Sequence, residues 1–171
     1  MSAERGSLPG FGRAGYALLA MSRWLALAGG LVFVALVAMS VVSIVGRKLA
    51  SSPVQGDVEM LQMSAAFACA AFFAYCHLMG GDVKVDFFTS RLSPRAVHWL
   101  DAFGSSLYTL VGAALTWRTL AGAMALRQSQ ETSVILGWPI WVAVLLMVPG
   151  FLLMTLAGLY MIGAHARLAR A

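Results

Sequence analysis

Three histidines are the residues of this sequence best placed to bind a cofactor. His77, His98 and His165 each stand near one end of a long apolar stretch. Haem b in a four-helix membrane protein needs two axial ligands that face each other at one depth, normally well inside the bundle. His77 and His98 can approach each other, but both stand close to the boundary of their stretches. We therefore expect no cofactor, and a haem b electron-transfer or anchor protein with four helices stands as an alternative.

The residue patterns that most enzymes and metal sites use are also missing from the sequence. It has no nucleophile–base arrangement, no Gly-rich phosphate loop and no Cys/His cluster with metal-ligand spacing. Cys69 and Cys76 are seven residues apart, about 10 Å on a helix, which is too far for a disulfide. We expect both cysteines to be small apolar fillers, and we expect that the chain is not an enzyme.

Charges inside a membrane span usually mark an ion or proton path. Beyond Arg118, which can snorkel to the membrane surface, the apolar stretches carry no acidic or basic residue at mid-depth. This pattern argues against transport by this chain alone. A small autonomous transporter that works as a homo-oligomer is the second alternative.

The composition places the protein in a membrane. Of its 171 residues, 60% are apolar and 11% are charged, against about 25% charged residues in a soluble domain. The net charge of +5 comes from basic residues at the ends of apolar stretches. This placement favours contact with lipid headgroups over nucleic acid as a partner.

Charged residues and interfacial aromatics divide the chain into four predicted transmembrane helices. The first stretch, uncharged from Trp24 through Gly46, is longer than the apolar core of a signal peptide, so we expect it to be retained. We predict an all-α integral membrane protein with one membrane domain over residues 1–171. The approximate helices are 22–48, 56–80, 94–126 and 138–166. The expected anchors at the two membrane interfaces are Trp99, Trp117, Trp138, Trp141 and Tyr160.

The Lys and Arg residues predict the orientation of these helices. Eight of them fall in the two termini and the loop between the second and third helices, and four fall on the other side. The positive-inside rule therefore places both termini and that loop in the cytoplasm. Within the loop, Phe87, Phe88 and Leu92 alternate with Lys84 and Arg91, which predicts a short interfacial helix.

Two features of the second helix predict its contacts. Asp57 and Glu59 open it, and Arg118 stands near the same end of the third helix, which we expect to run antiparallel beside it. We therefore hypothesise that one carboxylate pairs with Arg118, the alternative being simple capping of the helix N-terminus. Ala66, Ala70 and Ala74 recur every four residues, which is typical of a close-packing helix face in membranes.

Several segments together resemble a known family. They are Gly56-Asp57-Val58-Glu59-Met60-Leu61-Gln62, Ala71-Phe72-Phe73-Ala74-Tyr75, Gly81-Asp82-Val83-Lys84-Val85-Asp86-Phe87-Phe88, Arg91-Leu92-Ser93-Pro94-Arg95, Gly137-Trp138-Pro139-Ile140-Trp141 and Pro149-Gly150-Phe151. Their order and spacing over about residues 20–163 resemble the small membrane subunit (Q type) of tripartite ATP-independent periplasmic (TRAP) transporters. The family often shows Trp-x-Glu-Glu before the second span and His-x-x-Val-Asp after it, and this chain departs from both patterns.

The resemblance implies a non-catalytic scaffold subunit in a bacterial inner membrane. Its expected partners are a large multi-span permease subunit, a periplasmic substrate-binding protein and membrane lipids. Sodium is expected to bind the permease subunit, and the imported substrate is expected to be an organic anion, a carboxylate or a sulfonate. The candidate docking residues for the binding protein are the charges of the outer side: Arg47, Lys48, Asp57, Glu59, Arg127 and Glu131.

Overall fold

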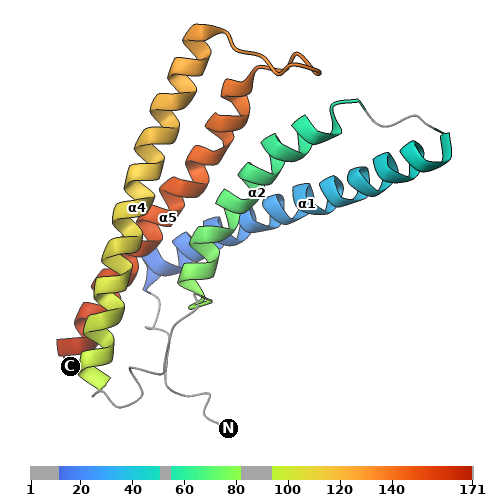
Figure 1. The fold of residues 1–171 in the computed structure, drawn as a ribbon. Helices are drawn as coiled ribbons and strands as arrows, with labels where there is room; N and C mark the ends of the chain where they lie inside the picture. Colours follow the sequence, from blue (N-terminus) through green and yellow to red (C-terminus); the bar gives the residue numbers. More distant parts are fainter. Residues whose placement is uncertain (1–11, 51–54, 82–93, 171) are drawn as a thin grey trace.

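The computed structural model describes residues 12–50, 55–81 and 94–170 (Figure 1). These residues form four α-helices: α1 (Arg13–Ala50), α2 (Asp57–Leu78), α4 (Pro94–Ser129) and α5 (Ile140–Arg170). Each is long and apolar enough to cross a membrane. In the described ranges the only β-type pairing is one isolated bridge between Thr132 and Pro139. The predicted interfacial helix falls in residues 82–93, outside the described residues.

Local chemistry explains where three of the helices begin or end. Gly56, with φ of 74°, directly precedes α2, and Gly80, with φ of 64°, follows its last turn. Pro94 occupies the first position of α4, where its missing N–H costs no helical hydrogen bond. Gly137, also at positive φ, turns the chain just before α5.

The first helix begins earlier than the sequence predicted. It starts at Arg13 and not near residue 22. The prediction used the charge of Arg23 as a boundary, but a charge limits the membrane-embedded length and not the helix itself. Arginine is a good helix former, so the helix continues through Arg23 toward the N-terminus.

The four helices stand in an open row in the order α1, α2, α5, α4 (Figure 1). Helix α2 packs between α1 and α5, and α5 packs between α2 and α4. The N-terminal part of α1 also reaches α5, where Leu18, Leu19 and Leu25 border a buried cluster. The third predicted helix, now α4, was expected to lie beside α2; instead α5 packs between them, and α4 contacts α2 through the Tyr108 side chain.

Small residues bring α2 close to both of its neighbours. A Cβ added at Gly29 of α1 would lie 2.8 Å from the Cβ of Ala71. A Cβ added at Gly150 of α5 would lie 2.6 Å from the carbonyl oxygen of Ala70. Ala70 and Ala74 of the predicted alanine face are fully buried, and Ala66 is half-buried. Because Ala68 and Ala71 form a second buried face toward α1, α2 is a spacer with small residues on two sides.

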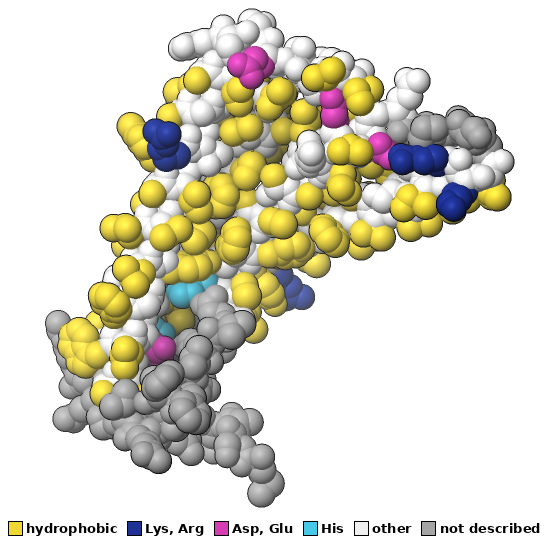
Figure 2. Space-filling model, viewed as in Figure 1, with side chains coloured by type: hydrophobic (Ala, Val, Ile, Leu, Met, Phe, Trp, Pro, Cys, Tyr) yellow, Lys and Arg dark blue, Asp and Glu magenta, His cyan; other side chains and the backbone are white. Residues whose placement is uncertain are grey.

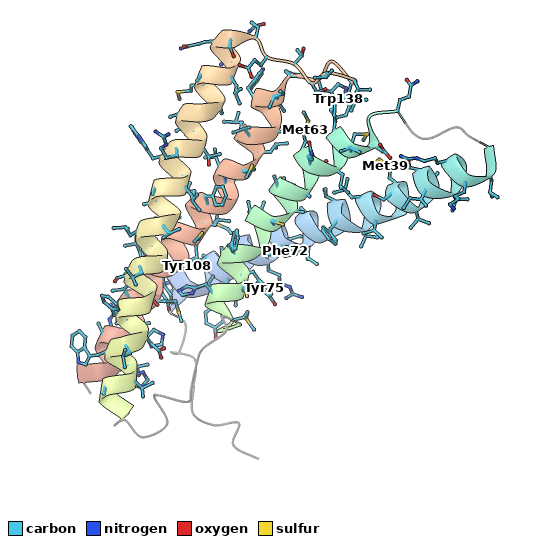
Figure 3. All side chains as sticks on the ribbon, in the orientation of Figure 1. Met39, Met63, Phe72, Tyr75, Tyr108 and Trp138 are labelled. Carbon is cyan, nitrogen blue, oxygen red and sulfur yellow. The ribbon has the colours of Figure 1, made fainter. Side chains whose placement is uncertain are left out.

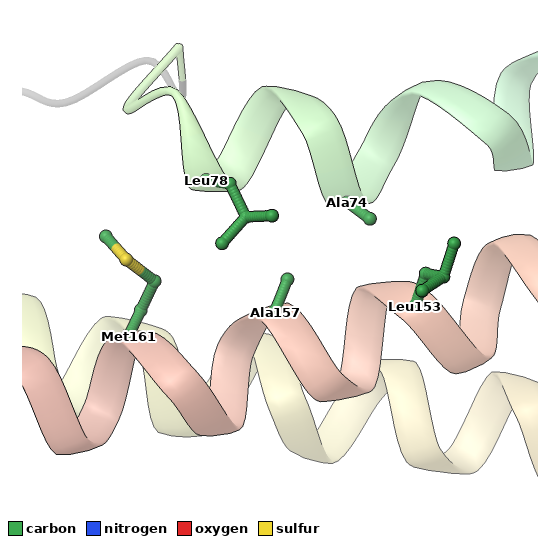
Figure 4. Close-up of a cluster of buried hydrophobic side chains, with 5 residues drawn as sticks. All are labelled: Ala74, Leu78, Leu153, Ala157 and Met161. Carbon is green, nitrogen blue, oxygen red and sulfur yellow. The ribbon is translucent and has the colours of Figure 1, made fainter. Parts of the chain in front are cut away.

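The core between α2 and α5 is made of complementary large and small side chains. Leu78, Leu153 and Met161 surround Ala74 and Ala157 in one buried cluster (Figure 4). In a bilayer, lipid is as apolar as these side chains, so close van der Waals packing and not the hydrophobic effect must hold such helices together. This core positions the row and leaves both of its edge helices available for other contacts.

Candidate functional site

One edge of the row is the apolar surface of α1. The buried side of this helix is a single stripe in which Gly15, Ser22, Gly29, Leu36 and Ser43 recur every seven residues, with Ala26 also buried beside them. The rest of the helix is mostly exposed and carries large aliphatic side chains, among them Leu31 and Val34, which are 74% and 67% exposed. A helix that is apolar all round but buried along one stripe needs lipid or protein around its other sides.

The other edge is the outer surface of α4, which mixes large and small side chains. Trp99, Phe103, Leu107 and Leu110 are exposed along its first half. In its second half Ala114, Ala121 and Ala125 are exposed on one face. Figure 2 shows hydrophobic side chains over most of the helical surface on the viewed face. Both edges are therefore suited to a non-aqueous environment.

At the end of the molecule formed by the α1–α2 corner and the α4–α5 loop, Asp57 ties α1 to α2. Its carboxylate accepts a hydrogen bond from the Ser43 hydroxyl at 2.5 Å and lies 3.5 Å from the Arg47 guanidinium. It also accepts the N–H of Val58 at 2.8 Å. Three donors from two helices thus converge on one carboxylate. We call this end of the molecule, with residues 43–50, 55–59 and 127–141, the loop end.

Glu59 ties α2 to the α4–α5 loop in the same way. Its two carboxylate oxygens accept the backbone N–H groups of Ile135 and Leu136 at 2.9 Å and 3.1 Å. The Leu136 side chain packs on Gly56, where an added Cβ would lie 2.6 Å from its Cγ. The loop itself is closed by Ser133, whose N–H donates to the Trp138 carbonyl at 2.8 Å and whose hydroxyl accepts the Trp138 N–H at 3.2 Å.

These contacts give both carboxylates partners other than Arg118. Arg118 is exposed on α4, and the structure does not bring it to Asp57 or Glu59. The physical reason is the helix order, since α5 packs between α4 and α2 and the contact of α4 with α2 is made at Tyr108, ten residues before Arg118. The alternative of simple capping also understates the role of these carboxylates, because each one joins two segments of the chain.

The predicted docking residues divide into two groups. Asp57 and Glu59 are half-buried in the contacts above, whereas the remaining four are exposed: Arg47, Lys48, Arg127 and Glu131. Of these four, Arg47 also pairs with Asp57. Arg127 lies over the Trp141 ring, 5.4 Å from its centroid, and Glu131 accepts a hydrogen bond from Ser129 at 3.1 Å.

The sequence analysis missed an apolar group on the same end. Val134, Ile135 and Trp138 are exposed, with Val134 96% exposed at the tip of the loop. Figure 3 labels Trp138 in this loop. The available signal was the run of aliphatic residues between the turn residues Ser133 and Gly137. These residues precede the predicted helix 138–166, and only Trp138 was named, as an interfacial anchor.

The aromatic residues expected at the membrane interfaces have different surroundings. Trp99, Trp117 and Trp138 are exposed. Trp141 and Tyr160 are half-buried, and the Tyr160 hydroxyl accepts the N–H of Gly12 at 3.1 Å. Anchoring at an interface remains a prediction for all five.

Cys69 and Cys76 are free, as expected from their spacing, but they are exposed and do not fill the interior of this chain.

The histidines do not meet as the haem alternative required. The His77 ring stacks on Tyr108 of α4 (labelled in Figure 3) at 4.0 Å between centroids, and the Tyr108 hydroxyl donates to the Phe73 carbonyl at 2.7 Å. His98 lies instead beside His165, with 5.9 Å between ring centroids. The approach of His77 to His98 that the sequence allowed is not seen, because His77 stacks on Tyr108 and His98 lies beside His165.

The fold and its surfaces define a class: a multi-pass membrane protein whose row of four helices presents two broad apolar edges and carries few charges within its helices. The family model for the DctQ component of tripartite ATP-independent periplasmic transporters matches residues 36–168. The chain belongs to this family and is the small (Q) component of a TRAP transporter. Membership implies partnership with the large TRAP permease and a periplasmic binding protein. No curated protein and no solved structure gives a significant match to the chain.

Proposed function

We propose that this subunit is a non-catalytic scaffold that braces the large permease subunit and helps to dock the binding protein. The observation that carries the proposal is the open row of helices. Its edge helices α1 and α4 are mostly exposed, apolar and free of mid-depth charge. Such surfaces suit a partner helix or lipid chains, and they offer no site for an ion or a polar solute.

The loop end is the proposed docking surface for the binding protein. Asp57 and Glu59 connect the α1–α2 corner to the α4–α5 loop. These contacts hold the two segments in fixed relative positions. The exposed charges Arg47, Arg127 and Glu131 lie on these segments or next to them. Val134 and Trp138 add apolar area at the centre of this end. An apolar centre with a charged rim is the usual composition of a protein–protein interface.

The same proposal includes the direction and the chemistry of transport. Both termini lie in the cytoplasm of a bacterium and the loop end faces the periplasm, as the excess of Lys and Arg in the termini and the 82–93 loop favours. The complex imports an organic anion, a carboxylate or sulfonate, coupled to sodium. Sodium and substrate bind the permease subunit, and membrane lipids surround the rest of the chain.

Reconstitution tests the scaffold role. Liposomes with this chain alone should show no solute uptake under an inward sodium gradient, because beyond Arg118 its apolar stretches carry no charged residue at mid-depth to form an ion path. Liposomes with the chain, its permease subunit and the loaded binding protein should take up the anion, and omission of this chain should abolish or strongly reduce uptake. Sodium-driven uptake by the chain alone would support the autonomous transporter instead.

A further inference from the structure

A cluster of metal-ligating side chains joins the N-terminal turns of α4 to the C-terminal turns of α5. His98 and Asp101 stand three residues apart on α4, which places them on one helix face. His165 reaches them from α5, with its Nδ1 3.9 Å from Asp101 Oδ2. One ligand atom from each residue lies within 4.8 Å of the others. Figure 1 shows these two helix ends side by side.

The cluster is shielded from solvent. The His165 side chain is 8% exposed and that of Asp101 is 22% exposed. The Nδ1 atom of His98 is buried and has no hydrogen-bond partner in the part of the chain that the structure describes. A buried polar nitrogen without a partner is costly unless something binds it.

The donor set identifies the class of ligand. Imidazole nitrogen suits zinc, copper, nickel and iron, and two imidazoles with one carboxylate are a common three-ligand set for Zn²⁺. With metal–ligand bonds of about 2.0–2.1 Å, tetrahedral ligand atoms lie about 3.4 Å apart. The cluster reaches this spacing through movements of roughly 1 Å, which small side-chain rotations supply.

We propose that His98, Asp101 and His165 form a binding site for a divalent transition metal, with Zn²⁺ as the probe ion. The three residues supply three ligands and leave a fourth position for water. The bound ion links α4 to α5 at the end opposite the loop end. This site is independent of the proposed scaffold function. The expectation of no metal-ligand cluster rested on spacing along the chain, and His165 is distant from His98 in sequence.

Zinc titration of the full-length chain, purified in detergent with a tag that contains no histidine, tests the proposal. The wild type should bind one Zn²⁺ per chain, and His98→Gln, Asp101→Asn and His165→Gln should each weaken binding at least about tenfold. His77→Gln is the matched control, because His77 stacks on Tyr108 outside the cluster, and it should bind as the wild type does. Absence of saturable binding to the folded wild type, or wild-type affinity in His98→Gln, overturns the site.

A second measurement needs no variant and so does not depend on variant folding. Co²⁺ added to the wild type should give the intense visible bands of a four-coordinate ion, and excess Zn²⁺ should remove them. Zn²⁺ should also raise the unfolding temperature of the wild type, and a chelator should reverse the rise. If Asp101 and His165 form only an ion pair, the wild type shows neither the bands nor the rise, and the proposal fails.

Discussion

Gly56 is the residue on which the loop end closes. Its φ of 74° lies in the left-handed region, and its missing side chain leaves room for Leu136 of the α4–α5 loop. The two residues thereby bring the backbone N–H groups of Ile135 and Leu136 to Glu59. Gly137 in the same loop also has a positive φ of 66°, but nothing lies within 4 Å of the position that a Cβ would take.

Alanine substitution of these two glycines distinguishes the cost of a positive φ from the cost of a steric clash with a neighbouring side chain. Gly137→Ala should lower the free energy of unfolding by about 1–2 kcal/mol, the cost of the left-handed conformation alone. Gly56→Ala should cost at least about 1 kcal/mol more, because its Cβ overlaps the Leu136 side chain. Unfolding of both variants in mixed micelles measures the difference. Equal losses would show that Leu136 yields freely and that Gly56 does not set the position of the loop.

The sequence located the important carboxylates but not their partners. Asp57 and Glu59 stood out because they open an apolar helix. Their partners Ser43, Ile135 and Leu136 carry no pattern of their own, since two of them contribute only backbone N–H groups. The same holds for His98 and Asp101, whose partner His165 follows more than sixty residues later. Such contacts are set by the helix order and not by local sequence.

At the scale of the elements, glycine and alanine decide which helices touch. Gly150 approaches the backbone of Ala70 so closely that no side chain fits between α5 and α2. Gly104, by contrast, is exposed on α4 and has nothing within 4 Å of its added Cβ. The two positions therefore provide a matched pair of glycines in membrane helices.

Gly150→Val should push α5 from α2 and lower the free energy of unfolding by about 1–3 kcal/mol, the usual cost of overpacking. Gly104→Val should be neutral or slightly stabilising, because valine is the better helix former and meets no neighbour. Unfolding in mixed micelles again provides the measurement. A similar loss in both variants would mean that helix propensity, and not contact with Ala70, governs the effect.

Helix existence was predictable from the sequence, whereas helix order was not. Charged residues and paired aromatics located four spans because few charges can enter the hydrocarbon region. All four helices are apolar on most sides, so hydrophobic periodicity gives no sign of which face meets which neighbour. The alanine face of α2 was the exception, and two of its three predicted members, Ala70 and Ala74, are buried.

For the whole molecule, the two apolar edges are the surfaces open to lipid and to a partner subunit. The exposed side of α1 is mostly large aliphatic residues such as Leu31 and Val34, which suit lipid chains, with Ala28, Ala35 and Ala38 among them. The exposed side of α4 includes Ala114, Ala121 and Ala125 on one face, and small residues are enriched where membrane helices pack closely. Within the proposed scaffold role, we therefore expect the permease subunit to pack on α4.

Tryptophan substitution distinguishes the two edges, because lipid chains yield to an indole whereas a packed helix does not. Ala114→Trp and Ala121→Trp on α4 should reduce co-purification of the permease subunit and anion uptake several-fold. Val34→Trp on α1 should leave both unchanged, and membrane levels of each variant provide the control for folding. Loss of permease co-purification with Val34→Trp alone would show that the permease subunit packs on α1 and not on α4. Unchanged co-purification in all three variants would count against bracing by either edge, because an indole at a tightly packed interface forces the helices apart.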